Sequence, residues 1–407
     1  MRPYRSPLLR ALGNLGLLLF VVTVLRVTPA LGLVQAPKPD YDALTRSGFE
    51  HFYSLEYDQA IRDFKQALEA RSDDAKAMNH LLEAVLFQQL HKYNALDTRL
   101  YAKQGFVTSK QVPVDAATKK QLMDLADRCM EASEKRLRSN PKDVEALYNR
   151  GVTEGMRATY LVIVEHSWFS ALRYALSARH DHEEVLRMRP SYSDAKTVVG
   201  AHNFVVGSLS LPVRAMAGVA GIRGDRKKGL EMLAEAANAG GETSSDARVA
   251  LSLFLRREDR LQDSLEVVRS LTRDHPRNFL FALEEDNLLR DLGRNPEALS
   301  KLRKLINDCK QGGYPNAHLE LADYSLGETL RALGQLPEAL EAYRRAASAG
   351  GDTGYRQKAL LGWGEVADLQ AKRQEAQTQY RAAIALDSSS EEAGAARKYL
   401  DKPYKGR

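Results

Sequence analysis

The C-terminal third of the chain repeats one arrangement of small, aliphatic and aromatic positions. The two copies consist of Gly327, Ala339, Tyr343 and Ala346, and of Gly364, Ala376, Tyr380 and Ala383. In both copies the first Ala follows the Gly by twelve positions, the Tyr comes four positions later and the second Ala three positions after that. The apolar residues between these positions recur at helical spacing. Each copy therefore predicts two helices that pack closely where a small residue faces a large one.

The same pattern can be placed on much of the rest of the chain. A good copy covers 41–74, and weaker copies lie at 245–278 and around Gly293. We also expect a helix over 76–100, an irregular segment over 101–114, and a helix over 116–139 that ends at Asn140-Pro141, because proline cannot continue a helix. Counting irregular units, the sequence predicts about seven or eight hairpins at a period of roughly 34 residues.

This small-and-large pattern resembles the tetratricopeptide repeat (TPR) family. The regular segments are rich in Ala, Leu, Glu, Arg and Lys, and long runs of alternating β-branched residues do not occur in them. We therefore expect an all-α protein, a TPR-type helical-hairpin solenoid (superhelix) with lengthened central repeats. In such an array each repeat contacts only its neighbours, and the array serves as a binding surface.

Two central units depart from the regular period. One opens at Gly151 and closes late, at Ala178 and Pro190, while the next opens at Gly200 and has its second small residue only at Gly229. Both units thus carry apolar insertions. The segments Phe204–Pro212 and Gly221–Leu230 within the second unit resemble the middle of the eukaryotic inclusion-body-clearance, or outer-membrane-protein-like, TPR proteins. That resemblance implies the same architecture and a bias toward lipid-associated or scaffold function.

The apolar stretch 204–222 allows two interpretations. Arg214, Pro212 and several Gly and Ser residues make it a poor membrane-spanning helix. We expect a buried plug that fills the hollow of the superhelix and packs against 160–164, Trp168 and Phe169. Membrane or lipid contact through 204–222 is the alternative.

The N-terminus has the features of a secretory signal peptide. Three arginines precede an uncharged run from Ala11 to Leu25, and small residues follow at cleavage spacing near Ala30 and Gly32. We expect a periplasmic or secreted protein, with an uncleaved membrane anchor as the alternative. The net charge of +6 includes four arginines in residues 1–32, so the mature chain is nearly neutral and predicts no nucleic-acid partner.

Candidate chemistry is scarce. Cys129 and Cys309 lie in different repeats, which favours free thiols over a disulfide. The cluster His180-Asp-His182-Glu-Glu184 offers two ligands on one helix face, too few for zinc, so we expect a solvated surface and no metal site. Asp225 is predicted to cap a helix that starts near Arg226. With no nucleotide-binding or nucleophile motif, we expect no enzyme activity, no catalytic residue and no cofactor.

The groove of the array is the predicted binding site. Counting TPR positions along the first helices of three hairpins, the residues expected to bind a partner are Leu283, Asn287, Arg290, Tyr324, Glu328, Arg331, Leu361 and Glu365. Leu280, Leu321, Lys358 and Asp368 occupy equivalent positions. This mixture suits an extended peptide or a partner helix, whereas Glu328 and Glu365 would repel a C-terminal carboxylate.

The predicted organisation has six parts: a signal peptide (1–32), a linker (33–40), an N-terminal TPR hairpin with following helices (41–139), central units with apolar insertions (140–244), regular C-terminal units (245–390) and a capping helix with tail (391–407). The favoured function is an exported bacterial TPR scaffold or adaptor that binds protein or peptide partners in its concave groove. The alternative is a carrier or sensor of lipid or another hydrophobic ligand, with the apolar insertion lining its cavity.

Overall fold

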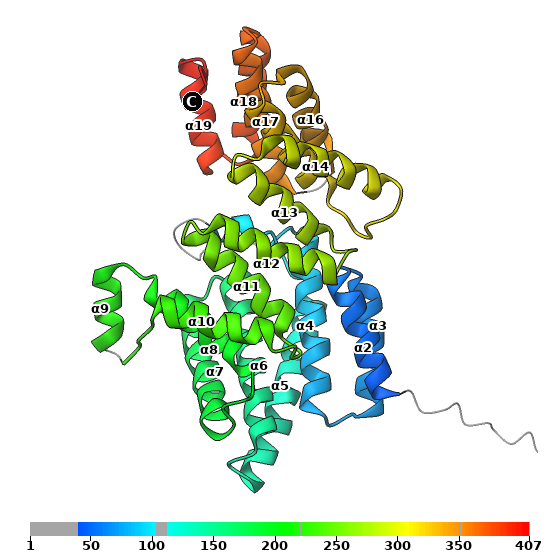
Figure 1. The fold of residues 1–407 in the computed structure, drawn as a ribbon, viewed down its shortest axis with the longest axis vertical. Helices are drawn as coiled ribbons and strands as arrows, with labels where there is room; N and C mark the ends of the chain where they lie inside the picture. Colours follow the sequence, from blue (N-terminus) through cyan, green and yellow to red (C-terminus); the bar gives the residue numbers. More distant parts are fainter. Residues whose placement is uncertain (1–39, 103–111, 220, 351, 407) are drawn as a thin grey trace, which may run out of the picture. The chain divides into compact units, whose positions relative to one another are not determined.

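The computed structural model describes residues 40–102, 112–219, 221–350 and 352–406. Every regular element in these ranges is helical (Figure 1), which confirms the predicted all-α class. The predicted signal peptide and most of the predicted linker lie outside the described residues. No helix within the described ranges is both long enough and apolar enough to cross a membrane.

The described helices pair along the chain into eight hairpins. Six of them have short connections, and the other two are joined across 93–115 and 208–225. The pairs are α2 (Tyr41–Tyr53) with α3 (Tyr57–Ala70), α4 (Ala75–Lys92) with α5 (Ala116–Ser139), α6 (Val144–Ile163) with α7 (Trp168–Met188), α8 (Ala195–Gly207) with α10 (Arg226–Asn238), α11 (Ser244–Arg257) with α12 (Leu261–Asp274), α13 (Phe279–Asp291) with α14 (Asn295–Lys310), α15 (Leu319–Ala332) with α16 (Leu336–Ser348), and α17 (Thr353–Leu369) with α18 (Arg373–Leu386). A last helix, α19 (Glu391–Asp401), packs on α18 at the predicted capping position.

Side-chain caps define where many of these helices begin. The side chain of Asp115 accepts hydrogen bonds from the backbone N–H groups of Ala117 and Thr118, which have no partner inside the helix. Asp225 accepts one from Lys228 in the same way, so the predicted cap of α10 is confirmed. Further caps of this kind are Asp74, Asp143, Asn278, Asp352 and Ser390.

The small-and-large pattern is a direct contact between the two helices of a hairpin. A Cβ added to Gly364 would lie 2.4 Å from Cε1 of Tyr380, and one added to Gly327 would lie 2.7 Å from the ring of Tyr343. Tyr343 also meets the next hairpin, where a Cβ on Gly362 would again lie 2.7 Å from its ring. The fully buried aromatic ring therefore locks its own hairpin and the following one together.

The central repeats are lengthened, as predicted, but by two different means. Helices α6 and α7 simply extend to 20 and 21 residues. In the next hairpin an extra helix, α9 (Leu211–Val219), is inserted between α8 and α10. Close contact survives the insertion, because a Cβ on Gly200 would lie 3.0 Å from the backbone oxygen of Gly229.

The prediction of a buried plug is wrong for most of the apolar insertion. Only its start is buried: Phe204, a residue of α8, is fully buried and stacks on Phe254 with ring centroids 4.1 Å apart. No residue of α9 is buried. Phe169, which we expected beneath the plug, is 93% exposed. The insertion thus projects from the hairpin instead of filling a hollow, because α8 and α10 already pack directly against each other and leave no space between them for a further helix.

The N-terminal hairpin also contacts hairpins more than 190 residues away in sequence. Asn278 Nδ2 donates to the backbone oxygen of Tyr53 at 2.7 Å, and Asn316 Nδ2 donates to that of Leu55 at 2.9 Å. Two buried acceptors at the end of α2 are satisfied in this way. Contacts of this kind go beyond the neighbour-to-neighbour packing of a simple repeat array.

Candidate functional site

The first helices of six successive hairpins enclose a cavity of about 600 Å³. Its wall is mainly apolar and includes the aromatic residues Phe49, Phe52, Tyr53, Phe87, Tyr148 and Phe281 together with the aliphatic residues Val152, Met156, Val249, Leu253 and Leu283. They come from α2, α4, α6, α11 and α13, while α8 contributes Thr197 and Val198. A concave apolar cavity of this size is typical of a ligand or peptide site.

Two carboxyl groups on opposite helices face this cavity without a cation beside them. They are Glu83 of α4 and Asp246 of α11, and neither forms an ion pair with a described residue. The Tyr53 hydroxyl donates to Asp246 Oδ1 at 3.1 Å. Burial raises the pKa of Asp246 to about 7 against the lowering effect of that hydrogen bond, and burial together with Asp246 raises the pKa of Glu83 well above its usual range.

A third cavity carboxylate shows the opposite behaviour. Glu242 lies 2.6 Å from Lys76 Nζ and 2.7 Å from His80 Nε2. Burial alone would raise its pKa, but the hydrogen bonds and charges of His80 and Lys76 lower that pKa to about 2. Among the carboxylates that line the cavity, Glu242 is therefore compensated by nearby cations, whereas Glu83 and Asp246 form no ion pair with a described residue.

Two buried imidazoles also reach the cavity wall. His182 Nδ1 donates to the backbone oxygen of Ala178 at 2.7 Å, so Nε2 is left as an acceptor, and it has no hydrogen-bond partner. Burial lowers the pKa of His182, which keeps the ring neutral. His80 likewise has a buried Nδ1 with no partner in the structure. Unsatisfied buried nitrogens at a cavity wall are places where a bound ligand can supply the missing hydrogen bond.

The prediction of a solvated surface at 180–184 is wrong for its central pair. Asp181 and His182 are both buried, and Arg150 binds the Asp181 carboxylate with two contacts of 2.7 Å. Helix α7 turns this pair inward because α6 and α7 form one long hairpin. Among the described residues no group of His, Cys, Asp and Glu side chains could hold a metal ion. Cys129 and Cys309 are free thiols, as predicted.

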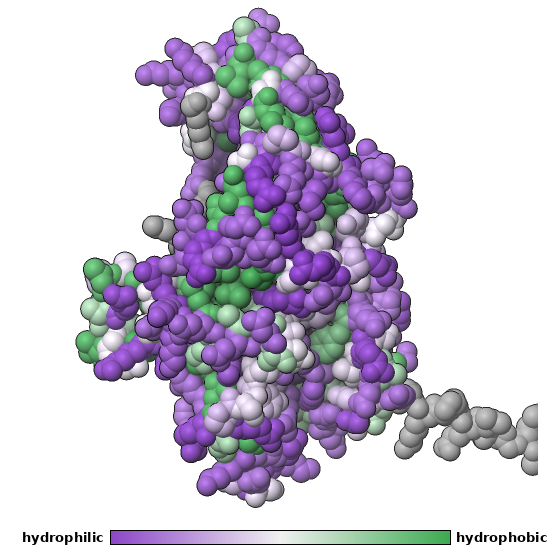
Figure 2. Space-filling model, in the orientation of Figure 1, coloured by the Kyte–Doolittle hydropathy of each residue, from purple (hydrophilic) through white to green (hydrophobic). Residues whose placement is uncertain are grey.

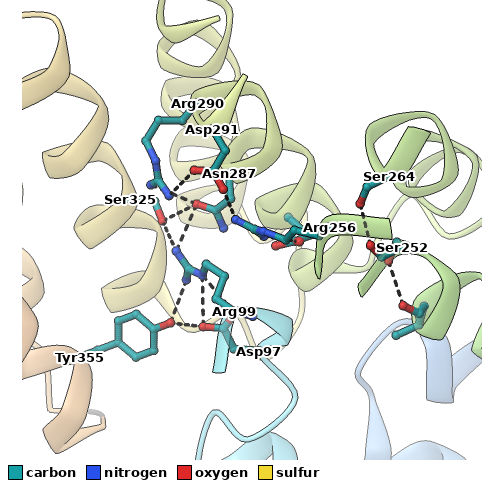
Figure 3. A network of polar contacts seen from close by, with 12 residues as sticks. Asp97, Arg99, Ser252, Arg256, Ser264, Asn287, Arg290, Asp291, Ser325 and Tyr355 are labelled. Atoms are coloured by element: carbon teal, nitrogen blue, oxygen red, sulfur yellow. Dashed lines mark hydrogen bonds and ion pairs between the residues drawn. The ribbon is translucent and has the colours of Figure 1, made fainter. Parts of the chain in front are cut away.

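The predicted C-terminal groove is partly occupied by the chain itself. A segment between α4 and α5, residues 97–101, includes a short 3-10 helix (Thr98–Leu100) and lies against α13, α15 and α17 (Figure 3). Arg99 Nη1 donates to Asn287 Oδ1 at 3.1 Å and to Ser325 Oγ at 2.9 Å. Its Nη2 donates to the Tyr355 hydroxyl at 3.0 Å. We call residues 97–101 the internal strap.

Two further contacts hold the internal strap. Asp97 pairs with the Arg99 guanidinium at 3.1 Å and accepts a hydrogen bond from the Tyr355 hydroxyl. Arg257 Nη1 donates to the backbone oxygen of Tyr101 at 2.6 Å. Although burial opposes ionisation, the charge of Arg99 lowers the pKa of Asp97, so the strap carries a buried ion pair.

The structure divides the predicted groove residues into two sets. Leu283 and Asn287 line the cavity, and Arg290 Nη1 donates to Asn287 Oδ1 at 3.3 Å. The other set lies on α15 and α17. Arg331 pairs with Glu328 at 3.1 Å and with Glu365, while Tyr324 and Leu361 pack against the hydrophobic core. These two glutamates are thus compensated by an arginine of their own groove, which their sequence positions alone do not reveal.

Comparison with known proteins supports the fold. No family model matches the sequence, and no curated protein matches it. A chain of the APC/C hetero-tetramer Cut9-Hcn1 matches the structure with a TM-score of 0.51 and 12% identity over 89% of this chain, which spans only 56% of that one. Yeast Tom70 matches with a TM-score of 0.41 and 13% identity, over 90% of this chain and 89% of that chain. YrrB, a TPR protein with an unusual peptide-binding site, matches with a TM-score of 0.31 and 17% identity, over 66% of this chain and 99% of that chain. The prediction of a TPR-type helical solenoid is confirmed.

Proposed function

We propose that this TPR-type protein is an exported scaffold that binds a segment of a protein partner in the cavity of about 600 Å³ between its first helices. The observation that carries the proposal is the cavity itself, in which six hairpins present apolar and aromatic side chains around Glu83 and Asp246. Such a site favours a ligand that combines an apolar body with a cation. The proposed role is binding rather than catalysis.

The chemistry of the cavity selects a basic residue flanked by apolar ones. A Lys or Arg side chain can pass its aliphatic stem along Phe49 and Val249 while its charged head lies between Glu83 and Asp246. Both carboxyl groups then gain a charged hydrogen-bonding partner, which stabilises their ionised forms. The cavity has room for a few residues, so we expect a short linear segment and not a folded domain.

Export is the second part of the proposal, and it rests on the sequence of the N-terminus. Arg2, Arg5 and Arg10 precede the uncharged run 11–25, and small residues follow at cleavage spacing. N-terminal sequencing of the protein from fractionated cells tests this part. A mature chain that begins after Ala30 or Gly32 outside the cytosol is the expected result, and a cytosolic chain that begins at Met1 would contradict it.

One observation favours a second candidate function. The cavity wall is predominantly apolar and its volume suits a drug-sized molecule, so a carrier or sensor of a hydrophobic ligand would also fit. The apolar insertion takes no part in that alternative, because no residue of 204–222 lines the cavity. The two candidates differ in whether binding depends on the carboxyl groups.

A binding experiment with matched variants separates them. Fluorescent peptides from an unbiased array, and a neutral hydrophobic dye, are titrated against the wild type, Glu83→Gln, Asp246→Asn and Phe281→Ala. Loss of one charged hydrogen bond should weaken peptide binding by roughly tenfold or more, whereas Phe281→Ala should weaken both ligands. The exposed Glu131→Gln on α5 serves as the control. Peptide binding that survives both carboxyl substitutions would overturn the proposed chemistry, and dye binding alone would favour the carrier.

A further inference from the structure

The exposed apolar side chains of this protein are concentrated in two short segments. In the described ranges eight large hydrophobic residues are exposed, and seven of them lie either at the start of α7 or on α9; they are Trp168, Phe169, Leu172, Leu211, Val213, Met216 and Val219. The eighth, Leu369, lies elsewhere. Single exposed apolar residues are ordinary on a protein surface, but a concentration of this kind marks a contact site.

Helix α9 carries most of this surface. Leu211, Met216 and Val219 are 72%, 67% and 93% exposed, and no side chain of the helix is buried. In Figures 1 and 2 it stands apart from the packed helices and shows hydrophobic groups to the solvent. In the described part of the chain no contact buries these side chains, so we look for their burial on another surface.

The start of α7 and helix α9 lie toward the same end of the packed helices α7 and α8. Helices α7 and α8 are packed together, and Arg179 Nη1 lies 3.0 Å from His202 Nε2. From this pairing α7 runs back eleven residues to Trp168, while α8 runs forward five residues to Gly207, just before α9. Because the two helices are antiparallel and rise about 1.5 Å per residue, both exposed segments lie toward one end of the pair.

Positive charge accompanies the exposed apolar residues. Between Gly207 and Gly229 the chain carries five basic residues and one acidic residue; they are Arg214, Arg223, Arg226, Lys227, Lys228 and Asp225. A hollow of about 400 Å³ beside α9 is lined by Arg214, Arg226, Lys227 and Arg260, with Asp225 and Glu258 also at its wall. Arg226 pairs with Glu258 at 2.9 Å, Arg260 with Asp263 at 2.6 Å and Lys227 with Glu231 at 3.8 Å. Four basic and two acidic side chains line the hollow itself, so its lining has a net positive charge.

We propose that α9 and the start of α7 form a peripheral membrane-binding surface that inserts into the headgroup region of an anionic phospholipid bilayer. The apolar side chains of α9, with Trp168 and Phe169, enter the interface, and the basic residues of 214–228 and Arg260 contact lipid phosphates. Trp, Phe and Leu beside Arg and Lys is the composition of interfacial segments. The cavity between the first helices takes no part in this surface.

Vesicle flotation with the full chain tests the proposal. Residues 1–39 are identical in all variants, so a difference in flotation between variants comes from the substituted side chains. We expect the wild type to float with vesicles of phosphatidylcholine and phosphatidylglycerol, and more weakly with phosphatidylcholine alone. The double substitution Phe169→Ser and Met216→Ser should reduce the partition coefficient by about tenfold or more. Arg223→Gln with Lys228→Gln should reduce it by about fivefold per charge at low salt. All four side chains are exposed, so folding is not at risk.

The control is Leu369→Ser, the remaining exposed hydrophobic residue, which should leave flotation unchanged. Equal flotation of wild type and both double variants would overturn the proposal. So would absence of wild-type flotation on anionic vesicles. Light scattering supplies the other arm: self-association that is lost with Phe169→Ser and Met216→Ser would assign the surface to a second copy of the chain and not to lipid.

Discussion

Arg99 and Asn287 are joined across 188 positions of the sequence by a hydrogen bond of 3.1 Å from Nη1 to Oδ1. Asn287 occupies a position that we expected to bind an external partner. The same guanidinium also reaches Ser325 and Tyr355, so one side chain from the internal strap contacts three successive first helices. An external peptide in that part of the groove would have to displace the strap, whereas the cavity beside it is lined by groups with unused bonding capacity.

Arg99→Ala should be strongly destabilising. The substitution removes the ion-pair partner of Asp97, a carboxylate that is 6% exposed, and breaking one half of a buried pair costs about 3–5 kcal/mol. Urea denaturation followed by circular dichroism measures the free energy of unfolding. Arg138→Ala removes an exposed ion pair with Glu134 and should change that free energy by less than about 0.5 kcal/mol. Equal effects of the two substitutions would refute the role of the strap.

Asp246 should make stability depend on pH. Its folded pKa of about 7 lies above the unfolded value, so the protonated group contributes stability that is complete below about pH 4 and is lost as the pH rises through 7. Asp246→Asn removes this dependence. The free energy of unfolding of the variant, relative to wild type, should therefore increase from pH 5 to pH 8. The ionisable groups around the site, Tyr53, Glu83, Glu242 and Asp194, are present in both proteins, and a constant difference would contradict the assignment.

A bound cation should reverse that behaviour. A Lys or Arg side chain between Glu83 and Asp246 favours their ionised forms, so binding should release protons and tighten as the pH rises toward 8. Calorimetric titration of a cavity-binding peptide in buffers of different ionisation enthalpy measures the protons released. With Asp246→Asn the release should diminish, and a peptide that binds with no proton release in wild type does not contact this carboxyl pair.

Two glycines test the packing of a hairpin. In Gly364→Ala the new methyl group meets the buried ring of Tyr380 at 2.4 Å, and such overpacking costs about 1–3 kcal/mol. Gly394 lies on the exposed face of α19 with no heavy atom within 4 Å of an added Cβ. Gly394→Ala should therefore be neutral or stabilising by up to about 1 kcal/mol, because alanine has the better helix propensity. Thermal unfolding of both variants measures the contrast.

The apolar insertion should respond differently at its two ends. Val206 is 7% exposed in α8, and Val206→Asp buries an unpaired carboxylate, which costs several kcal/mol. Val219 is 93% exposed, so Val219→Asp should change the free energy of unfolding by about 0.5 kcal/mol or less. Denaturation without lipid measures both. A large loss from Val219→Asp would mean that α9 is packed against the protein after all.

The predictable part of this fold is the part built from local contacts. Gly327, Tyr343 and their counterparts identify the hairpins because the small-and-large contact lies within one repeat, and Asp225 identifies a helix start because its cap bonds lie within three residues. The burial of Asp181 and His182 escaped prediction, since the face that a long helix buries depends on its neighbours.

The cavity was out of reach of sequence reasoning for a related cause. Glu83 and Asp246 look like surface residues of amphipathic helices, and only the arrangement of six hairpins brings them to one enclosure. The internal strap was likewise hidden, because its partners Asn287 and Tyr355 lie far along the chain and residues 97–101 carry no periodic pattern. We predicted a helix over 76–100, but α4 ends at Lys92, and the end of helical periodicity near Lys92 was the signal in the sequence.

The contacts of the N-terminal hairpin bear on how the chain acquires its structure. A repeat array with neighbour contacts alone can nucleate anywhere and propagate quickly. Here the backbone oxygens of Tyr53 and Leu55 accept hydrogen bonds from Asn278 and Asn316, and Arg99 donates to Tyr355. The early hairpins therefore obtain these contacts only after most of the chain has been synthesised. Closing loops of that length costs entropy before the distant contacts form, which raises the barrier to folding. Refolding should accordingly be a slow, concerted step, and an N-terminal fragment should remain a chaperone client until its distant partners emerge.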